Sequence, residues 1–258
     1  MDISNLAPFQ QTGMADENRA FVPLENNPEV MTTLVQQLGL SPKLQFHDVW
    51  SLTDPSLLAF LPRPAYALLL VFPITSTYEK FREEEDATRE EYTGFGPNEP
   101  VVWFKQTIHN ACGLIGLLHA VTNGEVVNFI DPGSSLKGLL DQANNLAPTQ
   151  RADLLYNSQA LEAAHATAAA MGDTQAPDAS EDVDLHFVAF IKDANGGLWE
   201  MDGRRKGPLF RGTLAEGEDV LSEHGQELGV GAFLKREEEA GGRELRFSVV
   251  MLGPSFDE

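Results

Sequence analysis

The chain has 258 residues, of which 42% are hydrophobic and 22% charged, and its 39 acidic against 18 basic residues give a net charge of −21. These proportions predict a globular protein with one sizeable core, and they exclude a wholly disordered chain. Such an acidic chain repels phosphate, so nucleic acid and anionic membranes are poor partners, whereas a basic peptide or protein is a good one.

The N-terminal residues lack the basic start and apolar stretch of a signal peptide, and no apolar run approaches the roughly 18 residues of a membrane span. With a single cysteine, no disulfide can form within the chain. We therefore expect a soluble protein in the cytoplasm, with access to the nucleus left open.

The first half of the chain mixes helical and extended patterns. Residues 1–19 are polar and without periodicity, which predicts a flexible arm. Apolar residues at helical spacing predict a helix over residues 30–38 that ends at Gly39. A short helix with inward-facing leucines is expected over residues 55–61. The nearly unbroken apolar run 65–74 predicts a strand that is buried on both faces.

Five further segments follow. The charged stretch 78–92 predicts a solvated helix, and the apolar stretch 113–121 predicts a buried one. Amphipathic helices are expected over residues 136–146 and 151–161. Residues 158–182 are rich in Ala, Asp and Thr and contain no Lys or Arg, which predicts a long functional or disordered loop.

The last part of the chain favours strands. Two apolar runs, 185–191 and 198–201, flank Asn195-Gly196, and this dipeptide is the strongest short-range signal for a hairpin. A final strand is expected over residues 244–251. Helices and strands mix without strict alternation, so the chain from residue 20 to 258 is predicted to be a single α+β domain with one central sheet.

Cys112 is the first candidate for chemistry. It directly precedes the predicted buried helix, and the positive end of a helix dipole favours a nucleophilic thiolate there. Gln106, just upstream, carries an amide that could stabilise an oxyanion together with the Cys112 N–H. A lone cysteine in an apolar neighbourhood is more often inert packing. The residues alone therefore leave a catalytic and a structural role open.

His186 is the best-placed base for this thiol. It stands on the strand that leads into the hairpin. The register expected for this hairpin pairs Asp202 with approximately Ala189, which places Asp202 diagonally near His186. A carboxylate within reach of an imidazole fixes its tautomer and stabilises its charged form. Because Asp202 is followed by glycine, a simple turn residue is an equally good interpretation of it.

The other histidines are weaker candidates. His165 and His224 lie in acidic stretches, where a solvated imidazole is expected. His47 and His119 lie in apolar stretches, where a packed imidazole is expected. His109 lies near Cys112 on the turn that enters the helix.

At these residues the chain resembles a known family. The segment 105–116 (KQTIHNACGLIG) resembles the active-site segment of the ubiquitin carboxyl-terminal hydrolases, which are papain-like cysteine peptidases. Residues 183–187 and 198–204 resemble the histidine and aspartate segments of that family. Further similar segments occur in the same order from about residue 21 to 252, so the resemblance covers nearly the whole chain. It is strongest to the small single-domain members.

The resemblance implies a fold and an activity. The fold is a papain-like α+β domain with a central antiparallel sheet flanked by helices and a knotted chain path. Cys112 becomes the nucleophile, His186 the general base, Asp202 its orienting residue and Gln106 the oxyanion donor. The implied reaction is hydrolysis of amide, ester or thioester bonds at the C-terminal glycine of ubiquitin or of a close ubiquitin-like protein.

The resemblance also implies how substrate binds. The C-terminal tail of ubiquitin carries arginines, so an acidic groove would attract and align it. Glu25 and Asp48 match family positions near that tail, and Leu24 and Leu185 are assigned to substrate binding with them. For any single acid, a solvated surface carboxylate is the commoner role. The enzyme is expected to act as a monomer and without a cofactor. No metal is expected either, because no Cys/His cluster has ligand spacing.

Residues 158–182 match the family's crossover loop, which passes over the active site. We expect it to admit small or flexible leaving groups and to reject folded ones. Two other functions are alternatives: a ubiquitin-tail binding module without turnover, and a thiol redox sensor. The second is disfavoured because the chain holds no second cysteine to resolve an oxidised thiol.

Overall fold

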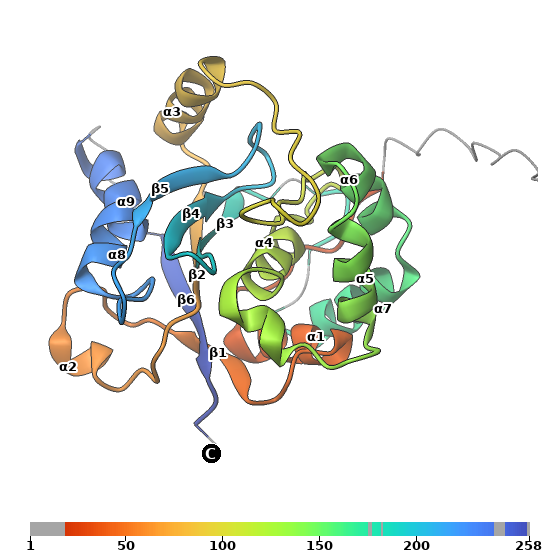
Figure 1. Ribbon diagram of the computed structural model, residues 1–258, viewed down its shortest axis with the longest axis horizontal. Coiled ribbons are helices and arrows are strands. Elements are labelled where there is room, and N and C mark those ends of the chain that lie inside the picture. Colours follow the sequence, from red (N-terminus) through yellow and green to blue (C-terminus); the bar gives the residue numbers. More distant parts are fainter. Residues whose placement is uncertain (1–18, 175–176, 182, 240–245, 257–258) are drawn as a thin grey trace, which may run out of the picture.

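The structure is a computed structural model that describes residues 19–174, 177–181, 183–239 and 246–256 (Figure 1). Its helices are α1 (Pro28–Leu38), α2 (Pro55–Leu58), α3 (Ser76–Ala87), α4 (Cys112–Val121), the 3-10 helix η1 (Gly124–Phe129), α5 (Ser135–Ala143), α6 (Pro148–Tyr156), α7 (Gln159–Ala169), α8 (Glu223–Leu228) and α9 (Val230–Glu239). Its strands are β1 (Leu44–Asp48), β2 (Ala67–Pro73), β3 (Leu185–Lys192), β4 (Gly197–Met201), β5 (Leu209–Thr213) and β6 (Ser248–Pro254). Apart from Arg19, the predicted arm lies outside the described residues, so its flexibility stays a prediction.

The strands of the described part form one antiparallel sheet in the order β1-β6-β2-β3-β4-β5. Helices α1 and α4–α7 lie on one side of the sheet, and α8 and α9 lie on the other (Figure 1). The predicted α+β architecture with a central sheet flanked by helices is therefore confirmed. The knotted path stays a prediction.

Strand β2 explains the unbroken apolar run in the sequence. All seven of its residues are buried, because helices cover both faces of the sheet at this point. Leu69 and Val71 pack into the larger core with α1 and α4. Leu68 and Leu70 point to the other face and pack with Phe233 of α9. The predicted strand with two buried faces is confirmed.

Helix α4 packs directly on β2 and β3. All of its residues after Cys112 are buried. Gly116 permits the close approach, since a Cβ at this position would lie 3.3 Å from the Leu69 side chain and 3.6 Å from that of Phe187. The sheet therefore fixes the position of the amino end of α4, and with it that of Cys112.

The predicted loop over residues 158–182 is wrong in its first half, where the chain forms α7. Ser158 is the N-cap of this helix, and its hydroxyl accepts a hydrogen bond from the Leu161 N–H at 3.3 Å. Alanine has the highest helix propensity, and α7 buries one side against α1. The helix predicted over residues 151–161 is accordingly divided between α6 and α7. The name crossover loop is kept for the described residues between α7 and β3, which are 170–174, 177–181 and 183–184.

Three smaller predictions also need correction. Helix α2 has no buried residue, and Leu57 is 40% exposed instead of facing the core. Helix α3 is not wholly solvated, because Tyr78 and Asp86 are buried. Strand β6 begins at Ser248, within the predicted strand 244–251, whose first two residues lie outside the described ranges. Among the described residues, no helix has the length and apolar character needed to cross a membrane.

Candidate active site

Cys112 is the first residue of α4 and is partly buried. The preceding Ala111 offers no side-chain cap, so the N–H groups of the first helical turn remain available to other partners. The thiol lines a crevice of about 50 Å³, and Leu24 and Leu185 lie on its walls. The amino end of a helix stabilises negative charge, so this position suits a thiolate.

His186 and Asp202 come from neighbouring strands. His186 lies on β3 and Asp202 directly follows β4, and the register pairs Ala189 with Met201. The register thus differs by one residue from the predicted pairing of Ala189 with Asp202. His186 Nε2 nevertheless lies 2.9 Å from Asp202 Oδ1. The side chains are 2% and 0% exposed, so the pair is removed from solvent.

Burial and charge act in opposite directions on this pair. Burial alone would lower the pKa of His186, but the Asp202 carboxylate and a hydrogen bond with the Cys112 thiol outweigh it and raise that pKa to about 9. Burial would raise the pKa of Asp202, but the charge and hydrogen bond of His186 hold it below its ordinary value. At neutral pH the pair is therefore an imidazolium bound to a carboxylate.

Tyr78 belongs to the same buried cluster and was not predicted. Its O–H donates a hydrogen bond to Asp202 Oδ2, while the Arg204 N–H donates to Oδ1 at 2.9 Å. Its ring centroid lies 6.1 Å from that of His186. Tyr78 comes from α3, whose charged sequence suggests a solvated helix. The aromatic residues Tyr78 and Phe81, spaced for one helix face, are the signal that could have revealed it.

Gln106 lies on the extended segment that leads to α4. Its backbone N–H donates to the Gly203 carbonyl at 2.9 Å. A Cβ at Gly203 would lie 3.0 Å from Gln106 Cβ, so glycine permits this contact. The side-chain Nε2 donates to the Ile108 carbonyl at 3.3 Å, and Oε1 is buried with no hydrogen-bond partner in the described part of the chain. Its role as an oxyanion donor stays a prediction.

Comparison with known proteins places this arrangement in a family. Residues 21–228 match the family model described as "Ubiquitin carboxyl-terminal hydrolase, family 1". The chain belongs to the ubiquitin carboxyl-terminal hydrolase family. Membership confirms the family predicted from the segment around Cys112 and makes the chain a thiol-dependent hydrolase.

Individual relatives agree with this assignment. The chain is 34% identical over 250 residues to ubiquitin carboxyl-terminal hydrolase YUH1 of Saccharomyces cerevisiae, and the alignment covers 95% of this chain and 100% of the relative. It is 36% identical over 230 residues to human ubiquitin carboxyl-terminal hydrolase isozyme L1, with 89% and 96% covered. The catalytic domain of Trichinella spiralis UCH37, solved bound to ubiquitin vinyl methyl ester, has a TM-score of 0.68 at 22% identity, with 93% and 97% covered. The last comparison shows a shared fold.

Three of the remaining histidines of this hydrolase, His47, His119 and His165, are packed away from solvent. His119 is fully buried, accepts a hydrogen bond from the Phe104 N–H at 3.0 Å, and has its pKa lowered by burial to about 4. His47 Nε2 lies 2.8 Å from a backbone carbonyl, as expected for a packed ring. The prediction of a solvated His165 is wrong, because this ring is 2% exposed and its Nε2 lies 2.7 Å from the Val22 carbonyl.

The four predicted substrate residues do not share one location. Leu24 and Leu185 line the crevice beside Cys112. Glu25 is next to Leu24, and its Oε2 accepts a hydrogen bond at 3.3 Å from a backbone N–H of the crossover loop. Asp48 ends β1 and lines a separate groove of about 610 Å³. Burial there raises the pKa of Asp48.

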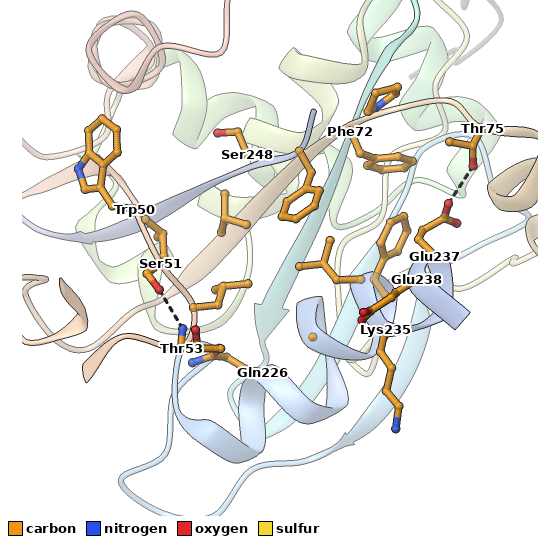
Figure 2. Close-up of a pocket in the computed structure, with 18 residues that line it drawn as sticks. Trp50, Ser51, Thr53, Phe72, Thr75, Gln226, Lys235, Glu237, Glu238 and Ser248 are labelled. Atoms are coloured by element: carbon orange, nitrogen blue, oxygen red, sulfur yellow. Dashed lines mark hydrogen bonds between the residues drawn. The ribbon is translucent and has the colours of Figure 1, made fainter. Parts of the chain in front are cut away.

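A larger cavity lies elsewhere in the hydrolase. It has a volume of about 710 Å³ between the end of β2, the start of β6 and α9. Figure 2 shows Trp50 on one side of it and, on another, the hydrogen bond from Thr75 Oγ1 to Glu237 Oε2 at 2.9 Å. None of the four proposed catalytic residues lines this cavity.

Within the described ranges, no cluster of His, Cys, Asp and Glu could hold a metal ion.

Proposed function

We propose that the chain hydrolyses bonds at the C-terminal glycine of ubiquitin, with Cys112 as nucleophile and His186, Asp202 and Gln106 in support. The observation that carries this proposal is the continuous chain of contacts from the Cys112 thiol through His186 to the buried Asp202. A thiol, an imidazole and an orienting carboxylate in this order are the groups that nucleophilic acyl transfer requires.

The proposed reaction proceeds in two halves. The Cys112 thiolate attacks the glycine carbonyl carbon, and the Cys112 N–H and the Gln106 amide donate to the developing oxyanion. Because His186 Nε2 is bound to Asp202, Nδ1 is the nitrogen that passes its proton to the leaving group. The bond to the leaving group breaks and a thioester remains. His186 then takes a proton from water, which attacks the thioester and releases the glycine carboxylate and the thiol.

The crevice and the charge support this substrate. A crevice of about 50 Å³ beside Cys112 suits a glycine-ended chain better than one with large side chains. Glu25 lies next to this crevice, and the net charge of −21 attracts a basic tail. A close ubiquitin-like protein with the same kind of tail is a second candidate. Action as a monomer in the cytoplasm stays a prediction.

Alkylation provides a test of the proposed function. Ubiquitin that carries a fluorogenic amine on its C-terminal glycine should release this amine with the untreated protein. Since Cys112 is the only cysteine, iodoacetamide can modify one thiol only, and release should then stop. Binding of free ubiquitin without any release would favour the tail-binding module instead.

The crossover loop should limit the size of the leaving group. We expect kcat/KM for a small ester or amide of ubiquitin to exceed that for ubiquitin joined to a folded protein by at least tenfold, because a folded group must displace the loop. The two rates can be compared with equal concentrations of enzyme. Equal cleavage of both substrates would contradict this expectation.

Tyr78 is proposed to position Asp202. Tyr78→Phe leaves Asp202 Oδ2 without the donor that now binds it. This loss should lower kcat about tenfold at nearly constant KM, and it should lower the free energy of unfolding by about 1–3 kcal/mol. Steady-state kinetics and urea unfolding measure the two effects. Tyr92→Phe is the control, because it also removes a hydroxyl bound to a carboxylate, that of Glu99 at 3.0 Å. A similar loss of kcat in both variants would contradict a specific role of Tyr78.

A further inference from the structure

We propose that Asn110 determines leaving-group specificity by tethering the crossover loop beside Cys112. The proposal rests on the proposed role of Cys112 as the nucleophile. It adds an anchor that the active-site residues do not supply. The relevant parts of the loop are its leading arm, residues 172–174, and its returning arm, residues 177–181.

The backbone of Asn110 is unusual. Its φ is 57°, and among the described residues it is the only one other than glycine with a positive φ. Asparagine tolerates this left-handed conformation better than most residues, at a cost of about 1 kcal/mol. The strained residue lies two positions before Cys112. Residues on either side of it, His109 and Ala111, make backbone hydrogen bonds that hold this turn in place.

The side chain of Asn110 binds the returning arm directly. Nδ2 donates to the Ala179 carbonyl at 3.0 Å and to the Glu181 carbonyl at 2.9 Å. These two bonds use both N–H groups of the amide. Because both acceptors are backbone carbonyls, the tether fixes the path of the loop whatever side chains the loop carries.

The leading arm is held more weakly, on the other side of the crevice. The Thr174 N–H donates to Glu25 Oε2 at 3.3 Å, and Asn27 Nδ2 donates to Asp173 Oδ2 at 3.4 Å. Both bonds are longer than the usual N–H···O distance and longer than the two bonds that Asn110 makes. A basic substrate tail at Glu25 would compete with the Thr174 N–H. Asn110 would then be the principal anchor of the loop during turnover.

The two anchors place the loop around the nucleophile. Asn110 and Cys112 line the same crevice, and Val183, which follows the returning arm, lines it too. A leaving group attached to the scissile bond must therefore pass between this crevice and the loop. A small or extended group can pass while Asn110 holds the loop, whereas a folded group requires that the tether break.

Two substitutions separate the tether from the backbone conformation. Asn110→Asp keeps the size and the tolerance of positive φ but turns an oxygen toward both carbonyls. Asn110→Gly keeps the conformation and removes the side chain. Asn157→Asp is the matched control, because Asn157 Nδ2 donates to a carbonyl of its own helix, that of Asp153, at 2.8 Å.

Two measurements test the proposal. The first compares two substrates: ubiquitin linked to a second, folded ubiquitin, and ubiquitin that carries a fluorogenic amine. The quantity measured is kcat/KM for the folded conjugate divided by kcat/KM for the fluorogenic substrate. We expect the ratio to rise about tenfold in both Asn110 variants, as loss of two ordinary hydrogen bonds implies, and to stay unchanged in Asn157→Asp. The second is amide hydrogen exchange over residues 177–181 of the free protein, which should become about tenfold faster in the Asn110 variants only.

The outcomes are distinguishable. Unchanged exchange in both Asn110 variants would overturn the tether. Faster exchange with an unchanged substrate ratio would overturn the specificity role. If the wild type hydrolysed neither substrate, the proposed function would fail and the specificity role with it, while the exchange rates would still report on the tether.

Discussion

Hydrolysis at the C-terminal glycine of ubiquitin should fall by about 10⁴-fold or more in Cys112→Ala, because the variant has no nucleophile and cannot form the thioester. Cys112 is partly buried at the start of α4, and alanine fits there without overpacking. The variant should therefore fold and should bind free ubiquitin as the wild type does. Initial rates with a fluorogenic ubiquitin substrate, together with calorimetric binding, measure both properties.

Cys112→Ser is the companion variant for this prediction. It keeps a side chain of similar shape but offers a hydroxyl, which is far less acidic than a thiol, so its rate should stay close to that of Cys112→Ala. Retention of more than a hundredth of the wild-type rate by the alanine variant would contradict a role for Cys112 as nucleophile. Loss of ubiquitin binding together with the rate would indicate a structural role instead.

Asp202→Asn should lower the rate at pH 7 by about 10²- to 10⁴-fold, as loss of the orienting carboxylate does in comparable triads. It should also change the pH profile. In the wild type, activity is expected to fall as the pH rises through about 9, where His186 loses its proton. Without the carboxylate, burial lowers the pKa of His186, so the alkaline limb should move down by more than about one pH unit.

The same shift makes a prediction about stability. The pKa of His186 is raised from 6.5 to about 9 in the folded state. Its contribution to stability is therefore complete below pH 6.5 and is lost as the pH rises through about 9. Urea unfolding at several pH values should show this loss in the wild type but not in Asp202→Asn. An unchanged alkaline limb in the variant would contradict the assigned ion pair.

Much of the fold could be predicted because local signals agree with the tertiary structure. Helix α1 has Asn27 as its N-cap, whose side chain accepts a hydrogen bond from the Glu29 N–H at 2.9 Å, and Gly39 with a φ of 115° as its C-cap. Both are signals that a sequence displays. The hairpin around Asn195-Gly196 placed His186 near Asp202 despite a register error of one residue.

Other features depend on contacts that no local pattern encodes. The Ala-rich segment that forms α7 becomes a helix with one side buried against α1. His165 is buried in contact with two residues far away in the sequence, because its Nε2 lies 2.7 Å from the Val22 carbonyl and its ring lies 4.8 Å from that of Phe21. Tyr78 reaches Asp202 although 124 positions separate them in the chain. Such long-range contacts decide burial and partners, and a single sequence does not display them.

Covalent capture would test the central claim most directly. Ubiquitin with a vinyl methyl ester in place of its C-terminal carboxylate presents an electrophilic carbon where the glycine carbonyl would lie. We expect the protein to gain the mass of one such ubiquitin, peptide mapping to place the adduct on Cys112, and no adduct to form in Cys112→Ala. Absence of an adduct in a wild type that binds ubiquitin, or an adduct that persists in Cys112→Ala, would contradict the central claim.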